Sequence, residues 1–419
     1  MTNLKHRKII PKLIDFIDDK EIIVLHGSRQ VGKTSVLRYL IDNYLRKEAG
    51  NNLFYFDLED FALLELCNEG TDRVMDYLKA KGADASRKTY LLIDEIQYLN
   101  NPSSFLKLFC DRYGSSVKLI VSGSSTFLIK KKFKNSLVGR IIDFELFPLD
   151  FEEFLEFKDK RFNLRAKMPH QAEDEINRLY KEFVLYGGYP AIVLENNVAK
   201  KEIKLKQMIN TYIKRDIRDL AEIRELDKFN NLIKVLSVQA GSLLNITELS
   251  NTLRLSKKTV EDYIFFLENT YIIRRVRPFY KNIRSELSKM SKIFFEDTGL
   301  MNLLANKTFS QNSTGNMLEN SIYSQLRKNL DVESLYFWRT NRGQEVDFVV
   351  DFTIREKETN LIPIEAKSLF LNKYTTHIRY FKNNYGPKKA YFCCLSKGED
   401  CRYPDIEIIY PWQILSSLE

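Results

Sequence analysis

The sequence contains few of the residues that cross-link small domains through disulfides or bind zinc. It contains only five cysteines and four histidines among 419 residues. The cysteines, at positions 67, 110, 393, 394 and 401, have no C-x-x-C spacing and fit no zinc template. This excludes a disulfide framework, and we expect reduced thiols in a cytoplasmic protein.

Long apolar runs are lacking as well. No stretch approaches the roughly 18 apolar residues that a membrane-spanning helix needs. Residues 1–12 are polar and basic, without the apolar centre of a signal peptide. We therefore expect no association with a membrane.

The chain has only a mild excess of one charge. Its 65 basic and 56 acidic residues give a net charge of +9. That excess suits a polyanion partner such as DNA, although solubility alone would also explain it. A hydrophobic content of 44% is enough for packed cores, and 419 residues are too many for one core. We expect two to four domains.

Against this background, one stretch has a clear chemical meaning. An apolar run of strand type, residues 22–26, leads into a loop of the pattern G-x-x-x-x-G-K-T. Glycines let backbone N–H groups wrap a phosphate at the start of the following helix. Lys33 supplies a cation for the β- and γ-phosphates of ATP, and the Thr34 hydroxyl is a ligand for Mg²⁺. The predicted nucleotide-binding residues are Gly27, Ser28, Arg29, Gln30, Val31, Gly32, Lys33 and Thr34.

A second signature lies at residues 90–95, where an apolar strand ends in Asp94 and Glu95. Ligands of open α/β sheets bind at the carboxyl ends of the strands. We predict that Asp94 holds Mg²⁺ and that Glu95 polarises the attacking water. A third apolar strand ends in the small polar residues 122–125, whose hydroxyls either sense the γ-phosphate or belong to an ordinary turn.

The alternation of these segments predicts the fold class. Apolar strands at 22–26, 53–58, 90–96 and 117–123 are separated by helical or irregular stretches, and a helical pattern precedes the first of them. Strands that alternate with helices predict an α/β fold, with a parallel sheet covered by helices on both faces.

These motifs together resemble the AAA-type (AAA+) ATPases. Within them, the chain is similar to the bacterial and archaeal branch with the P-loop G-x-R-Q-V-G-K-T, which also shows the L-V-G-R and L-F-P-L segments of residues 137–140 and 146–149. In related ATPases an arginine acts in trans on a neighbour's γ-phosphate, which implies an ATP-dependent homo-oligomer. Arg140 is the candidate, and the alternative is a structural arginine. The basic run 130–134 is interpreted as a solvated loop, and a finger that contacts nucleic acid is the alternative.

The middle of the chain contains helices and a turn. Residues 187–190, Gly-Gly-Tyr-Pro, stop a helix, and the resemblance implies a helical lid beside the nucleotide. Residues 228–280 have the pattern of a winged helix, with Ser256 as the N-cap of a helix over 257–268. We expect Lys257 and Lys258 to meet DNA there. The acidic residues 261 and 262 on the exposed face of the same helix would repel phosphates, so a protein-docking or domain-spacing module is the alternative.

The C-terminal part carries a second constellation. A junction at residues 291–300 matches the K-I-Y-F-x-D-T-G-L segment of the same family. Asp347 and then Glu365-Ala366-Lys367 follow the PD-(D/E)xK nuclease arrangement, and period-two alternation places Glu365 and Lys367 on one strand face. If the two strands pair, Asp347 and Glu365 meet around a divalent ion while Lys367 steadies developing charge. Glu319, on the preceding helix, is the usual fourth polar member and a further metal ligand.

The sequence thus predicts four domains: a P-loop AAA ATPase core at 1–150, a helical lid at 151–226, a winged helix at 227–285 and a small α/β nuclease-like domain at 286–419. The leading hypothesis is an ATPase, with ATP and Mg²⁺ as cofactors, coupled to a Mg²⁺-dependent nuclease that acts on DNA. The alternatives are a nucleotide switch whose C-terminal domain binds without cutting, and a DNA-binding regulator.

Overall fold

The computed structural model describes residues 4–123, 137–166, 168–212, 225–280, 289–305, 315–353 and 360–418. The chain divides into two compact units, Met1–Phe147 with Asn269–Tyr271, and Pro148–Glu268 with Ile272–Glu419. Three features named above lie outside the described residues: the hydroxyls of residues 124 and 125, the basic run 130–134, and the lid residues 213–224.

The first unit is built on a five-stranded sheet in which every pair of neighbouring strands is parallel. Its order is β2-β3-β4-β1-β5. The strands are β1 (Ile22–His26), β2 (Leu53–Asp57), β3 (Thr89–Asp94), β4 (Val117–Gly123) and β5 (Ile141–Glu145). The prediction of an α/β fold with a parallel sheet is confirmed. The predicted strand at 90–96 ends at Asp94, because Glu95 has a left-handed backbone with φ of 57°.

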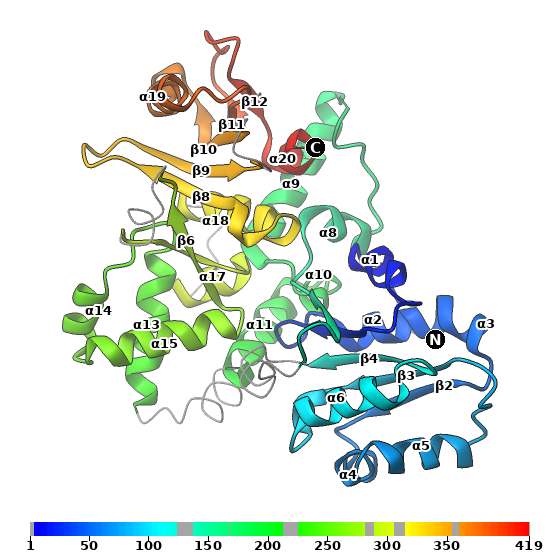
Figure 1. Ribbon diagram of the computed structural model, residues 1–419. Coiled ribbons are helices and arrows are strands. Elements are labelled where there is room, and N and C mark those ends of the chain that lie inside the picture. Colours follow the sequence, from blue (N-terminus) through cyan, green and yellow to red (C-terminus); the bar gives the residue numbers. More distant parts are fainter. Residues whose placement is uncertain are drawn as a thin grey trace. The chain divides into compact units, whose positions relative to one another are not determined.

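Helices cover both faces of this sheet (Figure 1). They are α1 (Ile9–Asp15), α2 (Lys33–Leu40), α3 (Arg46–Ala49), α4 (Phe61–Glu69), α5 (Thr71–Ala80) and α6 (Pro102–Tyr113). α4, α5 and α6 bury one apolar core against the strands, with Val74, Leu78 and Phe109 fully buried, and α2 lies on the other side of the sheet in Figure 1. A helix was expected from residue 34, and it passes into a π-helical turn at Ile41–Leu45.

The second unit begins with helices. These are α8 (Phe151–Phe157), α9 (His170–Tyr186), α10 (Pro190–Val193), α11 (Val198–Tyr212), α13 (Leu226–Val238), α14 (Ile246–Leu253) and α15 (Lys257–Asn269). The Gly-Gly-Tyr-Pro turn ends α9 as predicted, with Gly187 in the left-handed region at φ of 77°. The predicted cap of α15 is present as well, since the Ser256 hydroxyl accepts a hydrogen bond of 3.0 Å from the Thr259 amide.

A seven-stranded mixed sheet follows, in the order β12-β11-β10-β9-β8-β6-β7. Its strands are β6 (Ile273–Pro278), β7 (Lys292–Phe295), β8 (Leu335–Arg339), β9 (Glu345–Asp351), β10 (Leu361–Phe370), β11 (Tyr391–Lys397) and β12 (Glu407–Ile409). β9 and β10 are antiparallel, with Phe348 opposite Ile364. The pairing on which the predicted nuclease constellation depends is therefore present.

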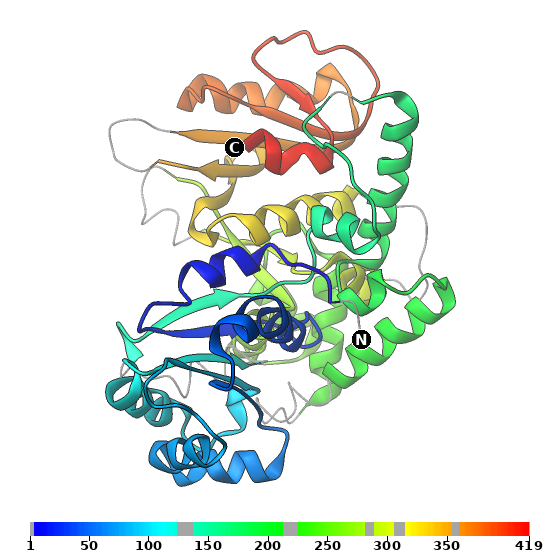
Figure 2. The same ribbon diagram turned by 90° about the vertical axis from the view of Figure 1, so that its right-hand side faces the viewer.

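Two helices sandwich this sheet. α18 (Gly315–Asn329) packs Ile322 and Leu326 on one face, and α19 (Thr376–Tyr385) packs Phe381 on the other. Figure 2 shows the strands between α18 in yellow and α19 in orange. α17 (Thr298–Ala305) and α20 (Ile414–Leu418) complete the unit. α18 thus faces the strands that carry the predicted carboxylates.

The pairing of β6 bears on the predicted domain boundaries in the middle of the chain. β6 was expected to be a strand of a separate winged helix, but it pairs with β7 on one side and with β8 on the other. The predicted boundaries near residues 226 and 285 therefore do not separate compact units. The hydrogen bonds of a continuous sheet join segments that differ in sequence pattern.

The five cysteines are free thiols, as expected from their spacing. Among the helices that the structure describes, none combines enough length with enough apolar character to cross a bilayer.

Candidate functional site

The P-loop of the first unit depends on backbone conformations that its sequence permits. A Cβ atom on Gly27 would lie 2.1 Å from the carbonyl oxygen of Leu146, so only glycine fits beside the chain that leaves β5. Gln30 and Gly32 have left-handed φ angles of 62° and 99°. Gly32 then serves as the N-cap of α2. These backbone conformations direct the loop toward the N-terminus of α2, and anions bind at helix N-termini.

Lys33 is the first residue of α2 and is almost fully buried. Its Nζ donates hydrogen bonds to the carbonyl oxygens of Gly27 (3.1 Å) and Ser28 (2.8 Å). The ammonium group is therefore held inside the loop. There it can exchange the carbonyl oxygens of Gly27 and Ser28 for phosphate oxygens while it stays within the loop.

Asp94 is the polar centre of this site. Its Oδ2 accepts hydrogen bonds from the hydroxyls of Thr34 (2.6 Å) and Tyr55 (3.0 Å), and its Oδ1 accepts from the Ser122 hydroxyl. These side chains lie at or near the carboxyl ends of three neighbouring strands and the start of α2. Thr34 and Asp94, each predicted as a ligand of Mg²⁺, thus lie in hydrogen-bond contact, and two oxygen atoms of this kind would suit a Mg²⁺ ion.

Glu95 lies directly beside Asp94 with its left-handed backbone. Its amide donates to Asp94 Oδ1 at 3.1 Å, and its carboxylate accepts a hydrogen bond from Gln97. This conformation ends the alternation of β3 at Asp94.

Arg140 lies elsewhere in the unit. Its guanidinium forms two hydrogen bonds with Asp111 of α6, of 2.6 and 3.3 Å, and its carbonyl accepts from the amide of Ile22. Ile22 begins β1, whereas the P-loop follows its last residue. Five strand residues separate the two edges by roughly 16 Å. The structure does not bring Arg140 to the P-loop of its own chain.

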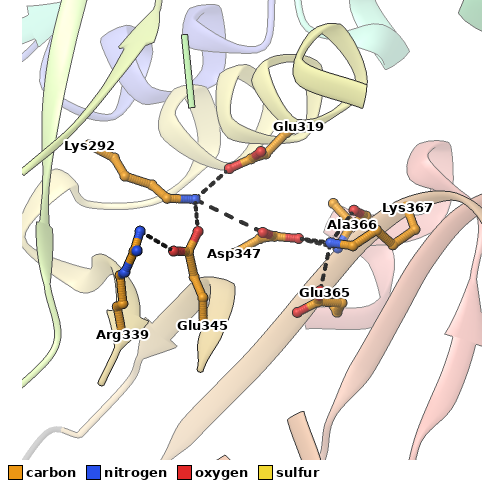
Figure 3. A network of polar contacts seen from close by, with 8 residues as sticks. All are labelled: Lys292, Glu319, Arg339, Glu345, Asp347, Glu365, Ala366 and Lys367. Carbon is orange, nitrogen blue, oxygen red and sulfur yellow. Dashed lines mark hydrogen bonds and ion pairs between the residues drawn. The ribbon is translucent and has the colours of Figure 1, made fainter. Parts of the chain in front are cut away.

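In the second unit, the predicted nuclease residues meet at Lys367 (Figure 3). Its Nζ lies 2.9 Å from Asp347 Oδ2, 2.6 Å from Glu365 Oε1 and 3.0 Å from the carbonyl oxygen of Ala366. The Ala366 amide donates to the same Asp347 oxygen at 2.8 Å. Three oxygens therefore converge on one cationic nitrogen, from the third residue of β9 and the middle of β10.

Contrary to the prediction, Glu319 is paired with a different lysine. It binds Lys292 of β7 at 2.8 Å, and the same ammonium binds Glu345 at 2.6 Å (Figure 3). In the described part of the chain, no three Asp, Glu, His or Cys side chains are arranged to hold a metal ion. The prediction that Glu319, Asp347 and Glu365 surround one ion is therefore not met, because a buried lysine lies beside Glu319.

Burial makes two carboxylic acids of this cluster, Glu365 and Glu319, weaker than usual. It raises the pKa of Glu365 to about 8 and that of Glu319 to about 7, and the charge of Asp347 adds to both effects. Burial lowers the pKa of Lys367, but Asp347 and Glu365 more than offset it and hold that pKa above its usual value. Oε2 of Glu365 is buried and has no hydrogen-bond partner, so it is an acceptor that a cation would satisfy.

These shifts predict that the second unit is less stable at alkaline pH. The folded state retains a proton on Glu365 that the unfolded chain releases near pH 4.5, so the free energy of unfolding falls as the pH rises from there to about 8. We expect a loss on the order of 3 kcal/mol without divalent ions. Both tryptophans, Trp338 and Trp412, belong to this unit, so their fluorescence during urea unfolding measures it.

Glu365→Gln is the matched variant for that experiment. It cannot ionise, and above pH 7, where Glu319 has largely released its proton, it should lose most of the slope that the wild type keeps. Equal slopes for the wild type and Glu365→Gln between pH 7 and 8.5 would contradict the assignment.

Sequence reasoning missed several residues of these sites. Tyr55 is one aromatic among several in an apolar run, and nothing in its spacing marks it. Tyr271 is another: its hydroxyl lies 2.6 Å from His26 Nδ1 and 3.2 Å from Glu145, next to the P-loop. Lys292 did carry a signal, since a lysine at the start of an otherwise apolar strand needs a buried partner.

Family models match three parts of the chain. Residues 19–155 match the model described as AAA domain. Residues 177–311 and 314–415 match models described as Domain of unknown function (DUF8612) and Domain of unknown function (DUF4143). The P-loop site lies in the range matched by the AAA domain model, and Asp347, Glu365 and Lys367 lie in the range matched by the DUF4143 model.

Curated relatives cover most of the chain but have no described function. An uncharacterized protein of Methanocaldococcus jannaschii is 28% identical over 354 residues, which are 83% of this chain and 76% of that protein. An uncharacterized protein of Haemophilus influenzae is 25% identical and covers 97% of both chains. The order of parts in this chain is therefore found as a whole in other microbial proteins.

Solved structures give weaker likenesses. The Walker-type ATPase PABY2304 of Pyrococcus abyssi aligns with 72% of this chain and 96% of its own, at 14% identity and a TM-score of 0.45. Cdc6p of Pyrobaculum aerophilum aligns at 12% identity and a TM-score of 0.32, with 74% and 96% covered. Both scores lie below 0.5, so we draw no conclusion from them. The matched AAA domain and the geometry around Lys33, Thr34 and Asp94 identify the first unit as a P-loop AAA ATPase.

Proposed function

We propose that this chain hydrolyses ATP to control a Mg²⁺-dependent nuclease-like domain that acts on DNA. The observation that carries the nuclease part is the convergence of Asp347, Glu365 and the Ala366 carbonyl on one cation position. Oxygen ligands of this kind suit a hard divalent ion. The side chain of Lys367 is 36% exposed, so its ammonium can swing outward when such an ion takes the position.

The ATPase part follows from the residues around Asp94. Bound Mg²⁺ would neutralise charge on the β- and γ-phosphates. The Thr34 hydroxyl and the Asp94 carboxylate, which lie 2.6 Å apart, are the residues that would hold it. Lys33 exchanges its loop carbonyls for phosphate oxygens and stabilises the charge that develops during hydrolysis. Glu95 orients the attacking water and accepts its proton.

The proposed chemistry at the second unit would also use a metal ion, carboxylates and a lysine. Mg²⁺, when bound, would supply an activated water to a phosphodiester. Asp347 and Glu365 would hold the ion, and the Lys367 ammonium would supply positive charge that stabilises negative charge on the phosphate.

DNA contact is proposed for α15. Lys257 and Lys258 are exposed at its start, and α13, α14 and α15 followed by the antiparallel pair of β6 and β7 have the order of a winged helix. The exposed residues Glu261 and Asp262 oppose phosphate binding, and Arg275 is paired with Glu268 at 2.6 Å. A protein-docking module is the alternative for this helix.

The test is incubation of the protein with plasmid DNA, Mg²⁺ and ATP. We expect nicking or linearisation that depends on Mg²⁺ and that changes when ATP is withheld. Plasmid, linear and single-stranded DNA that all remain intact with the wild-type protein would end the nuclease proposal.

The alternative function is a nucleotide switch whose second unit binds without cutting. Lysine ammonium groups beside both Asp347 oxygens favour it, because a cluster that is already neutralised needs no metal ion. Slow turnover, with nucleotide still bound after purification, would support the switch.

A trans role for Arg140 requires that copies of the chain assemble. If the role is correct, the ATPase activity per molecule rises with protein concentration, and Arg140→Ala lowers it by about tenfold or more at high concentration. Asp111→Ala, which removes two hydrogen bonds from the guanidinium but keeps Arg140, serves as the control and should retain the wild-type activity. Activity that is independent of concentration in the wild type and unchanged in Arg140→Ala would leave Arg140 as a structural partner of Asp111.

A further inference from the structure

The function proposed above leaves Lys292 unexplained. This residue begins β7, in the junction segment 291–300, and its side chain is only 2% exposed. Its Nζ lies 2.8 Å from Glu319, 2.6 Å from Glu345 and 3.9 Å from Asp347 Oδ1 (Figure 3). A lysine is rarely buried so deeply unless carboxylates pair with it.

Asp347 is shared by two cation positions. Its Oδ2 faces Lys367, together with Glu365 and the Ala366 carbonyl. Its Oδ1 faces Lys292, together with Glu319 and Glu345. Two cations that share one carboxylate have the layout of a two-metal site, in which neighbouring ions are bridged by a common ligand.

The two positions differ in whether the lysine can leave. The Lys367 side chain is 36% exposed, and water can receive its ammonium. Lys292 is 2% exposed, and its Nζ lies 5.6 Å from the ring centre of Phe337. Moving this ammonium would remove the counter-ion of Glu319 and one of the two cationic partners of both Glu345 and Asp347, which is strongly unfavourable for a buried ion pair.

We propose that Lys292 permanently occupies the second cation position, so that the site accepts one divalent ion and not two. The inference rests on the proposed nuclease-like function for the first position. It gives Lys292 the role of a positioning residue: its ammonium holds Glu319 and Asp347 in place and supplies the charge that a second metal ion would otherwise bring.

Charge balance agrees with this assignment. Glu319, Glu345, Asp347 and Glu365 bring four negative charges, while Lys292 and the Arg339 partner of Glu345 bring two positive ones. One divalent ion at the first position, with Lys367 moved outward, neutralises the remainder. A second divalent ion would leave an excess of positive charge.

The experiment counts bound Mn²⁺ by electron paramagnetic resonance, as the loss of the free-ion signal. Asp347→Ala lacks the shared ligand and sets the baseline, which also removes any contribution of the P-loop. We expect the wild type to bind one Mn²⁺ more than this baseline and Lys292→Ala to bind two more. Lys367→Ala is the matched control and should stay at one, since it removes an ammonium that already moves.

The outcomes separate this inference from the proposed function. If Lys292→Ala gains no ion over the wild type, the inference is wrong whether or not the protein cuts DNA. If the wild type binds none above baseline but Lys292→Ala gains one, the assignment of Lys292 to the second cation position stands, and the proposed metal site at Lys367 is wrong.

The loss of a buried counter-ion can prevent folding of Lys292→Ala. The double variant Lys292→Ala with Glu345→Gln removes one negative charge with the lysine and keeps Glu319 and Asp347. It should also gain one Mn²⁺, and divalent ions should raise its melting temperature, measured by tryptophan fluorescence, more than that of the wild type. A folded double variant with the wild-type ion count would overturn the proposal.

Discussion

Lys33→Ala should lower the rate of ATP hydrolysis by about 10²- to 10³-fold or more. Charge that develops on the phosphates during hydrolysis needs a fixed cation in a site shielded from water, and removing one such donor has an effect of this size. The Lys33 ammonium is buried within the loop that would hold the phosphates and binds two of its carbonyl oxygens. Phosphate release under saturating ATP measures the effect.

The control for this variant is Lys79→Ala. Lys79 is an exposed lysine in the last turn of α5, so its removal changes the net charge of the first unit by the same amount without touching the loop. It should hydrolyse ATP at the wild-type rate. If Lys33→Ala also hydrolyses ATP at that rate, the assignment of residues 27–34 as the catalytic phosphate loop fails.

If the proposed nuclease function is correct, Asp347→Asn should abolish DNA cleavage while ATP hydrolysis continues. Among the described residues, this carboxylate is the only group that contacts both Lys367 and Lys292, so the amide would remove a ligand from the proposed metal ion and a partner from both lysines. The loss of several kcal/mol of metal-assisted stabilisation corresponds to about 10²- to 10³-fold in rate. Plasmid nicking and phosphate release, measured on the same sample, separate the two activities.

Asp351→Asn is a matched control on the same strand. Asp351 ends β9, and its side chain accepts a hydrogen bond from the Thr353 amide, away from both lysines. It should cut DNA at the wild-type rate. Equal loss of cleavage in both variants would mean that β9 had been disturbed, and equal cleavage in both would remove Asp347 from the catalytic group.

The sequence predicted the P-loop site well because its parts are local. Lys33 and Thr34 are neighbours, and Asp94 ends an apolar strand, so sheet geometry alone brings them to one edge. The same holds for Asp347, Glu365 and Lys367, which come from two strands close together in the chain. In both places the pattern of alternation decides which side chains share a face.

The contributions of Tyr55, Tyr271 and Lys292 could not be predicted in this way. Tyr55 reaches Asp94 only because β2 pairs with β3. Tyr271 reaches His26 only because residues Asn269–Tyr271, from the last residue of α15 onward, belong to the first unit. Glu319 lies 27 positions after Lys292 and Asp347 lies 55 positions after it, and no local rule relates them.

The sequence by itself therefore determined the two sets of chemical groups, since each is written in short motifs whose spacing matches one turn or one strand. Tertiary structure alone decided which carboxylates share a cation. Glu319 has the right residue type and helix for a metal ligand, but β7 places the Lys292 ammonium beside it. Electrostatic partners are chosen by distance and burial in the folded sheet, and neither is fixed until β6, β7 and β8 have paired.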